Sequence, residues 1–418
     1  MKKLLAIILT LVLLLTAVCA CTDEKETTKK PNTSSSSVSS TEDTSSVESE
    51  ISSEEETSSE ATSSEEEVVE KPVVNTSSTP EEEEKEEKPE NEDPKAEEEE
   101  ELSEGMKIIK NLRGGINFSA MDHGAGIKNK NTYVYKREYY DLIAEAGFDH
   151  VRLPVGLGSI VISEGPEYLL DTEALRYLDM ALEHALDAGL VIFLDNHHGS
   201  GYENKEKFVR IWEQIAERYR QYPDQLMFEL VNEPNGMSDD HVNEVQMAAA
   251  EVIRKTNPTR ILALAPNQWN GIGKVWDTQV PSTLDENGQI KYDPNVVMSV
   301  HMYAILEFTH QVLDGNPLCH WTDGIKDHVT AQLEVCADYE ARTGRECWIS
   351  EWGCYQGGHQ GADSADGCMQ KYYKHVTSEF ARLDLAYAVW EFNQGFGVYN
   401  SNTNEFWDYL MDNMILTW

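Results

Sequence analysis

The feature that most constrains the fold is a regular alternation, from residue 112 onward, of short apolar runs with longer amphipathic segments. Short apolar runs of this length are typical of buried strands, and the segments between them have helical spacing. The expected strands cover residues 112–118, 148–153, 190–195, 226–231, 261–265, 296–301, 347–351 and 385–391. Eight strands that alternate with helices predict an α/β fold, a (β/α)8 TIM barrel.

The expected helices place apolar residues three or four positions apart. This spacing runs from Tyr139 to Ala146, from Leu175 to Leu186 and from Phe208 to Tyr219. Gly147 and Gly189 stand where two of these helices should end before the next strand. Further helices are expected at 240–256, 325–343, 366–382 and 404–416, whereas 270–293 shows no clear helix.

An open, doubly wound sheet also alternates strands with helices, so it is the competing fold. Such a sheet typically carries Gly-x-Gly-x-x-Gly directly after its first strand. Here Arg113-Gly114-Gly115 lies within the first expected strand instead. The open, doubly wound sheet, a fold that typically binds nucleotides, is therefore the weaker alternative.

The first 21 residues have the pattern of an export signal. Lys2 and Lys3 precede an apolar run over 4–18, which is too short for a stable membrane span. The run ends in Cys19-Ala20-Cys21, and a small residue before a cysteine at this place resembles a bacterial lipoprotein cleavage site. We expect a lipid on Cys21 and a protein held at the outer face of the membrane; ordinary secretion is the alternative.

Residues 22–104 form an acidic segment rich in Ser, Thr and Glu, with 30 acidic and 7 basic residues. Such a composition buries too little apolar surface to fold, so a disordered linker is predicted. It would hold the folded domain, residues 105–418, clear of a cell surface; a partner-binding acidic tail is the alternative. The formal net charge of −41 argues against a nucleic-acid partner, which requires a basic surface.

The strand ends carry polar side chains, and in a barrel the carboxyl ends of the strands form the active-site rim. Strands two, three, four, six, seven and eight all contribute to this set. It comprises Arg152, His197 and His198, Asn232 and Glu233, His301 and Tyr303, Glu351, and Trp390. Trp269, in a loop after the fifth strand, is a looser candidate for a further binding residue.

With Asn232-Glu233-Pro234 on strand four and Glu351 on strand seven, the sequence resembles glycoside hydrolase family 5 over about residues 108–418. The stretch 387–397 and Phe308-Thr309-His310-Gln311 also resemble cellulase members of that family. One departure is the stretch 302–305, where many relatives have a second aromatic residue and a proline. The resemblance implies that Glu233 is the acid/base and Glu351 the nucleophile of a retaining glycosidase.

Chemistry supports such a pair independently, because glycoside hydrolysis needs one carboxylic acid and one carboxylate that face each other. Arg152 and Tyr303 would lower the pKa of Glu351 and hold it ionised, since a cation and a hydroxyl donor both favour a carboxylate. The pKa of Glu233 is expected to be raised. Asn232 would bond the 2-hydroxyl of the sugar, His301 would assist proton exchange at Glu233, and Trp390 would stack against a sugar ring.

Asp195, His197 and His198 could instead bind a metal ion, as in metal-dependent barrel hydrolases. Neighbouring strand residues point to opposite sides, so only one of the two histidines should face the rim squarely. We therefore expect no metal and no cofactor. Five cysteines lie beyond the signal, and we expect small buried thiols with one disulfide at most; their pairing cannot be deduced. They are Cys319, Cys336, Cys347, Cys354 and Cys368.

The leading functional hypothesis is a monomeric endo-β-1,4-glucanase that acts on a β-linked polysaccharide. Activity on β-mannan, xyloglucan or another β-glucan is an alternative, because the loops at the strand ends set specificity. A non-catalytic carbohydrate-binding lipoprotein is an alternative of another class. The presence of both Glu233 and Glu351 argues against it, since a pure binder needs no facing carboxylates.

Overall fold

The computed structural model describes residues 101–121, 136–303, 305–310, 320–356 and 367–418. Eight parallel strands close into a barrel in the order β1-β10-β9-β8-β5-β4-β3-β2. The predicted barrel is confirmed and the open sheet is wrong, because β1 pairs with both β2 and β10. The strands are β1 (Gly114–Asn117), β2 (His150–Val155), β3 (Val191–Asn196), β4 (Leu226–Glu229), β5 (Leu262–Leu264), β8 (Val296–Met302), β9 (Cys347–Trp352) and β10 (Tyr387–Val389).

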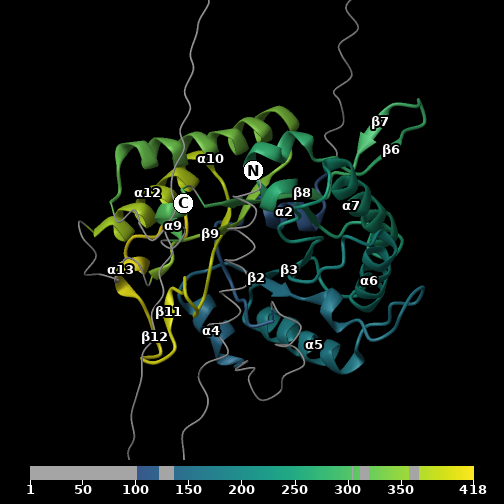
Figure 1. Ribbon diagram of the computed structural model, residues 1–418, viewed down its shortest axis with the longest axis horizontal. Helices are drawn as coiled ribbons and strands as arrows, with labels where there is room; N and C mark the ends of the chain where they lie inside the picture. The colour runs from purple at the N-terminus through teal and green to yellow at the C-terminus, as the bar shows by residue number, and fades with distance from the viewer. Residues whose placement is uncertain (1–100, 122–135, 304, 311–319, 357–366) are drawn as a thin grey trace, which may run out of the picture. The chain divides into compact units, whose positions relative to one another are not determined.

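The helices surround the strands as an outer ring (Figure 1). Asp171 caps the N-terminus of the helix α5 (Thr172–Asp187) by accepting hydrogen bonds from the backbone N–H groups of Glu173 and Ala174. As predicted, Gly147 (φ +98) and Gly189 (φ +81) follow helix ends in a backbone conformation that suits glycine. The long helices are α4 (Glu138–Glu145), α5 (Thr172–Asp187), α6 (Lys205–Arg218), α7 (Asp239–Arg254), α10 (Asp323–Thr343) and α12 (Cys368–Leu383).

The segment between β5 and β8 lacks a long helix, as predicted. It holds α8 (Asn267–Asn270), a single turn, then a short 3-10 helix, η2 (Ile272–Asp277). The strands β6 (Ser282–Leu284) and β7 (Ile290–Tyr292) follow as an antiparallel pair. Figure 1 shows this hairpin projecting beyond the ring of helices.

The helix predicted at 404–416 is wrong. The chain instead forms an antiparallel pair of β11 (Tyr399–Asn400) and β12 (Glu405–Phe406), followed by one turn, α13 (Asp408–Met411). Asn404 has a left-handed backbone (φ 59), which turns the chain between the two strands. The ring of Phe406 then packs 5.2 Å from that of Tyr399. Tertiary packing therefore overrides the helical spacing here.

One end of the barrel is closed by α2 (Glu104–Ile109), which Ser103 caps by accepting from the Met106 N–H. Met106 and Ile109 share an apolar cluster with strand residues that include Phe193 and Trp348. The rings of Phe193 and Trp348 stack 3.7 Å apart. With α2 packed at the start of the strands, the opposite, carboxyl rim is the end that can admit a ligand.

Four of the five expected thiols lie in the described chain, and all four are buried, which agrees with the expectation of small buried thiols. They are Cys336, Cys347, Cys354 and Cys368. Cys319 lies outside the described residues, as do Cys21, the export signal and all but the end of the acidic linker. Among the described residues no helix is both long enough and apolar enough to span a membrane.

Candidate active site

Glu351 lies near the end of β9, with 4% of its surface exposed. Its Oε1 accepts a hydrogen bond from Arg152 Nη1 at 2.7 Å. Its Oε2 accepts from the Tyr303 hydroxyl at 3.0 Å. The sequence predicted both contacts, and both favour the charged form of the carboxyl group.

Arg152, on β2, is fully buried and links several strands. Besides Glu351, its guanidinium contacts Asp195 at 2.9 Å and Glu229 at 2.6 Å. It also donates to the Oδ1 of Asn232 at 2.7 Å. Burial acts to lower the pKa of Arg152, but the three carboxylates raise it well above its usual value. The cation therefore remains charged and orders the acidic groups around it.

Glu233 follows β4 in a left-handed backbone conformation (φ 46). Its Oε1 lies 3.1 Å from Nδ1 of His301, and 35% of its side chain is exposed. The opposite ring nitrogen of His301, Nε2, lies 3.6 Å from Oε1 of Glu351. The imidazole thus stands between the two carboxyl groups, and one oxygen of each glutamate lies within 4.8 Å of the other.

The pKa values of the two glutamates are both shifted upward by burial. Burial raises the pKa of Glu351 to about 7, more than His301, Arg152 and Tyr303 lower it. The prediction of a lowered pKa for Glu351 is therefore wrong, because desolvation outweighs its partners. For Glu233 the predicted upward direction agrees with the structure. Two carboxyl groups this close cannot both be charged without cost, so they share a proton.

His197 and His198 have different environments. His197 is buried, and its Nδ1 lies 2.6 Å from Oδ2 of Asp195. Its ring stacks on Trp390, with 5.6 Å between centroids and 8° between planes. His198 is exposed, and its ring lies 4.6 Å from that of His197. Trp390 is half-buried, so part of its ring remains accessible next to His197.

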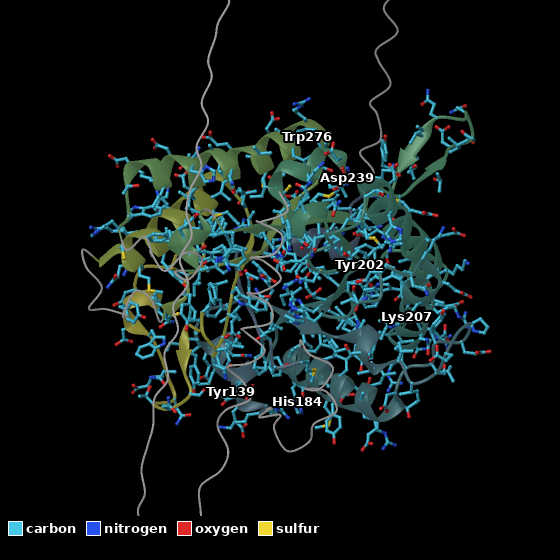
Figure 2. The ribbon with its side chains drawn as sticks, viewed as in Figure 1. Tyr139, His184, Tyr202, Lys207, Asp239 and Trp276 are labelled. Atoms are coloured by element: carbon cyan, nitrogen blue, oxygen red, sulfur yellow. The ribbon has the colours of Figure 1, made fainter. Side chains whose placement is uncertain are left out.

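The loop that carries Glu233 is fixed on both sides. Tyr202, labelled in Figure 2, donates its hydroxyl to the backbone carbonyl of Asn235 at 2.6 Å. The same hydroxyl accepts the Asn235 N–H at 3.0 Å. On the other side, the N–H of Trp269 donates to the carbonyl of Pro234 at 3.2 Å. Trp269 is 44% exposed, so this candidate lies at the surface next to the acid/base loop.

The alternative metal site does not fit the geometry. Asp195 binds His197 and Arg152, so its carboxylate already has a cation. Within the described chain, a group that does have metal-ligand spacing is Glu233, His301 and Glu351. Its imidazole presents a different nitrogen to each glutamate, Nδ1 to Glu233 and Nε2 to Glu351. A ring placed in this way can exchange a proton with either carboxyl group.

Several residues of this network were not among the predicted site residues. Glu229 lies in the middle of an apolar stretch, Phe228-Glu229-Leu230, and a charge within a buried strand is a signal that could have revealed it. Asn270 and Ser299 carry no such signal. His310 lies close to the site as well, with its ring 4.9 Å from that of Tyr303 and 5.2 Å from that of Phe396.

A closed (β/α)8 barrel with two facing glutamates at its carboxyl rim defines a class, the barrel glycoside hydrolases that work with two carboxyl groups. The sequence matches the family Cellulase (glycosyl hydrolase family 5) over residues 112–395. This chain belongs to glycosyl hydrolase family 5, and the predicted resemblance is confirmed.

Endoglucanases are among the proteins that this chain is similar to. Endoglucanase B of Clostridium cellulovorans is 24% identical over 322 residues, which cover 70% of this chain and 71% of that protein. Endoglucanase H of Acetivibrio thermocellus is 31% identical over 179 residues, but the match covers 41% of this chain and 19% of that protein. A solved structure, endoglucanase Cel5A of Thermotoga maritima, is 27% identical with a TM-score of 0.66, and the match covers 74% of this chain and 99% of that chain.

Proposed function

We propose that this chain is an endo-β-1,4-glucanase that retains the configuration of the anomeric carbon. One observation carries the mechanism: an oxygen of Glu233 lies within 4.8 Å of an oxygen of Glu351. Retaining enzymes hold their carboxyl groups about 5–5.5 Å apart, whereas inverting enzymes leave about 6.5–9.5 Å for a water molecule. The shorter distance supports direct attack by one glutamate.

In the first step, Glu351 attacks the anomeric carbon while the bond to the leaving oxygen breaks. The proton of Glu233 passes to that oxygen, so the leaving sugar departs neutral and a glycosyl ester remains on Glu351. In the second step, Glu233 takes a proton from water, and the resulting hydroxide equivalent displaces Glu351 from the sugar. Both glutamates then return to their starting states.

The assignment of roles follows from the neighbours. Arg152 and Tyr303 both donate to Glu351, so the negative charge is better stabilised there than on Glu233. Glu233 contacts His301, whose pKa burial lowers to about 4, so the imidazole is neutral at working pH. The shared proton therefore resides on Glu233. His301 then lies in position to guide that proton.

The remaining site residues contact the sugar in this proposal. Asn232 is held by Arg152 through its Oδ1, which orients the amide toward the sugar 2-hydroxyl. A bond to that hydroxyl strengthens in the transition state. Trp390, backed by His197, supplies a flat apolar surface for a sugar ring. His198 and Trp269 are exposed nearby and extend the binding surface.

A β-1,4-glucan is the preferred substrate because the named relatives are endoglucanases. Mannan is the principal alternative, since a structure of the Thermotoga maritima enzyme is titled as a complex with mannotriose substrate. The test is release of reducing sugar from carboxymethyl-cellulose, β-mannan, xyloglucan and laminarin. We expect the fastest release from the cellulose derivative, with an early fall in viscosity that marks endo action. Release from none of the four, with binding retained, would favour the carbohydrate-binding alternative.

We also propose, from the sequence alone, that a diacylglyceryl group on Cys21 anchors the protein to the outer face of the membrane through the acidic linker. Mass spectrometry of the mature N-terminus tests this proposal. A Cys21→Ala variant should be released to the medium with full activity. An unmodified N-terminus in the wild-type protein would contradict the anchor.

A further inference from the structure

The turn after β5 has an unusual backbone. Gln268, Trp269 and Asn270 all have positive φ angles, of 60°, 61° and 52°. Residues other than glycine rarely adopt this conformation, and three in succession persist only where the surroundings fix them. Side-chain hydrogen bonds at both ends of the turn hold this backbone in place.

Asn267 anchors the first end of the turn. Its Nδ2 donates to Oδ1 of Asp239 at 2.7 Å and to the carbonyl of Met237 at 3.1 Å. Asp239, labelled in Figure 2, is the first residue of α7. These contacts tie the turn to the start of α7 and to the end of the loop that precedes it, and neither of them involves a residue of the catalytic pair.

Asn270 anchors the second end and is fully buried. Its Nδ2 donates to the carbonyl and to the Oγ of Ser299, both at 3.0 Å. Its Oδ1 accepts the backbone N–H of Glu233 at 2.7 Å. An amide suits this place because it accepts on one side and donates on the other. One side chain therefore links β8 to the backbone of Glu233.

Glu233 itself has a positive φ of 46°, so its backbone also needs support. Its N–H is bound by Asn270, and the next carbonyl, of Pro234, accepts from Trp269. The two bonds hold the loop after β4 against the turn after β5. The direction of the Glu233 side chain follows from this backbone conformation, and with it the 3.1 Å contact to His301.

We infer that Asn270 is a positioning residue for the acid/base. It touches no reacting atom, but it holds the backbone of Glu233 in the conformation that presents the carboxylic acid to the leaving oxygen. The link continues through Ser299, whose Oγ donates to Oε1 of Glu229 at 2.7 Å, to Arg152 and thus to the nucleophile. This inference rests on the proposed role of Glu233.

The test uses the leaving-group dependence of the first step. In Asn270→Ala the acid is misplaced, so kcat/KM on a β-glucan should fall about 10- to 100-fold, as expected for small misplacements of a catalytic group. An aryl cellobioside with a good leaving group, such as 2,4-dinitrophenol, needs no acid and should keep its rate of glycosylation within about 3-fold. An equal loss on both substrates would overturn the inference.

Asn267→Ala is the matched control. It removes an amide from the same turn, at a residue with only 8% of its surface exposed, without touching Glu233. We expect it to lower the melting temperature by an amount similar to Asn270→Ala, but to leave the ratio of the two substrate rates unchanged. A shift of that ratio in Asn267→Ala as large as in Asn270→Ala would show that the turn acts only structurally.

Ser299→Ala is a milder second variant that keeps the test decisive if Asn270→Ala does not fold. It removes one acceptor of Asn270, so the rate on β-glucan should again fall more than the rate on the aryl cellobioside, but by a smaller factor. If this selective loss does not appear, the inference is contradicted.

Glu233→Ala separates the two proposals. If Glu233→Ala shows no leaving-group dependence, the role of Glu233 is wrong; if it does and Asn270→Ala does not, the role of Asn270 is wrong.

Discussion

Arg152 donates its Nη1 to Oε1 of Glu351 across 2.7 Å, from strand β2 to strand β9. The same guanidinium contacts Asp195 and Glu229, and all four side chains are buried. One guanidinium group thus forms ion pairs with three carboxylates. The nucleophile is therefore not an isolated charge but one member of a buried network whose order depends on the shape of the arginine fork.

Arg152→Lys should remove that order although it keeps the charge. A lysine is a point charge and cannot reach the three carboxylates with a planar fork, so at least one of them is left unpaired. Breaking a buried pair costs about 3–5 kcal/mol, which we expect as lost stability in urea denaturation. We also expect kcat to fall by at least about 100-fold. The control is Arg220→Lys, in an exposed pair with Glu217, which should change stability by less than about 0.5 kcal/mol.

The pH dependence of kcat/KM should show which glutamate holds the shared proton. Burial raises the pKa of the pair, to about 7 at Glu351. Because Arg152 and Tyr303 favour the charged form of Glu351, the last proton of the pair is that of the acid, Glu233, whose pKa burial raises. The rate should therefore fall on the alkaline side, as the pH rises through the raised pKa of Glu233.

The alkaline fall should disappear in Glu233→Ala when an aryl glycoside with a good leaving group is the substrate, since no acid is then needed. A rate on the β-glucan that shows no fall on the alkaline side would contradict the role of Glu233 as the acid. A rise at lower pH, as Glu351 loses its proton, is compatible with the role of Glu351 as the nucleophile.

Much of this site could be predicted from the sequence because barrel topology carries every strand end to one rim. The order of apolar runs was enough to place Arg152, Glu351 and His301 near one another. The link from Asn270 to Glu233 could not be predicted, because it depends on a left-handed turn and a side-chain contact between two separate loops. Whether the pKa of Glu351 is raised or lowered depends on how far burial removes water from its carboxyl group. The identity of its partners alone does not reveal this.

Glu340, in α10, offers a test of stability away from the active site. Its Oε1 accepts the N–H of Cys347 at 2.7 Å, yet burial raises the pKa of Glu340 to about 8. A folded pKa above the unfolded value means that its contribution to stability is present at low pH and is lost as the pH rises to about 8. Glu340→Gln keeps an acceptor for Cys347 without the charge.

The glutamine variant should therefore match wild type near pH 4 and become more stable up to about pH 8, by about 1–3 kcal/mol. Thermal unfolding at several pH values measures this difference. Glu183→Gln, at an exposed position of α5, is the control and should show no such trend. A constant difference at every pH would mean that packing, rather than the charge of Glu340, is responsible.

The last prediction separates the roles of the two glutamates by chemical means. Glu351→Ala should abolish turnover on every substrate, because no other group can form the glycosyl ester. Glu233→Ala should slow hydrolysis of β-glucan by at least about 100-fold but spare the first step on aryl glycosides with good leaving groups. Added azide should then restore turnover and give a β-glycosyl azide, because a small anion can enter the space left by the side chain and needs no base. A 2-fluoro cellobioside should label Glu351, as peptide mass spectrometry would show. A label on Glu233 would reverse the roles, and an α-configured first product would mean that water, not Glu351, attacks the sugar.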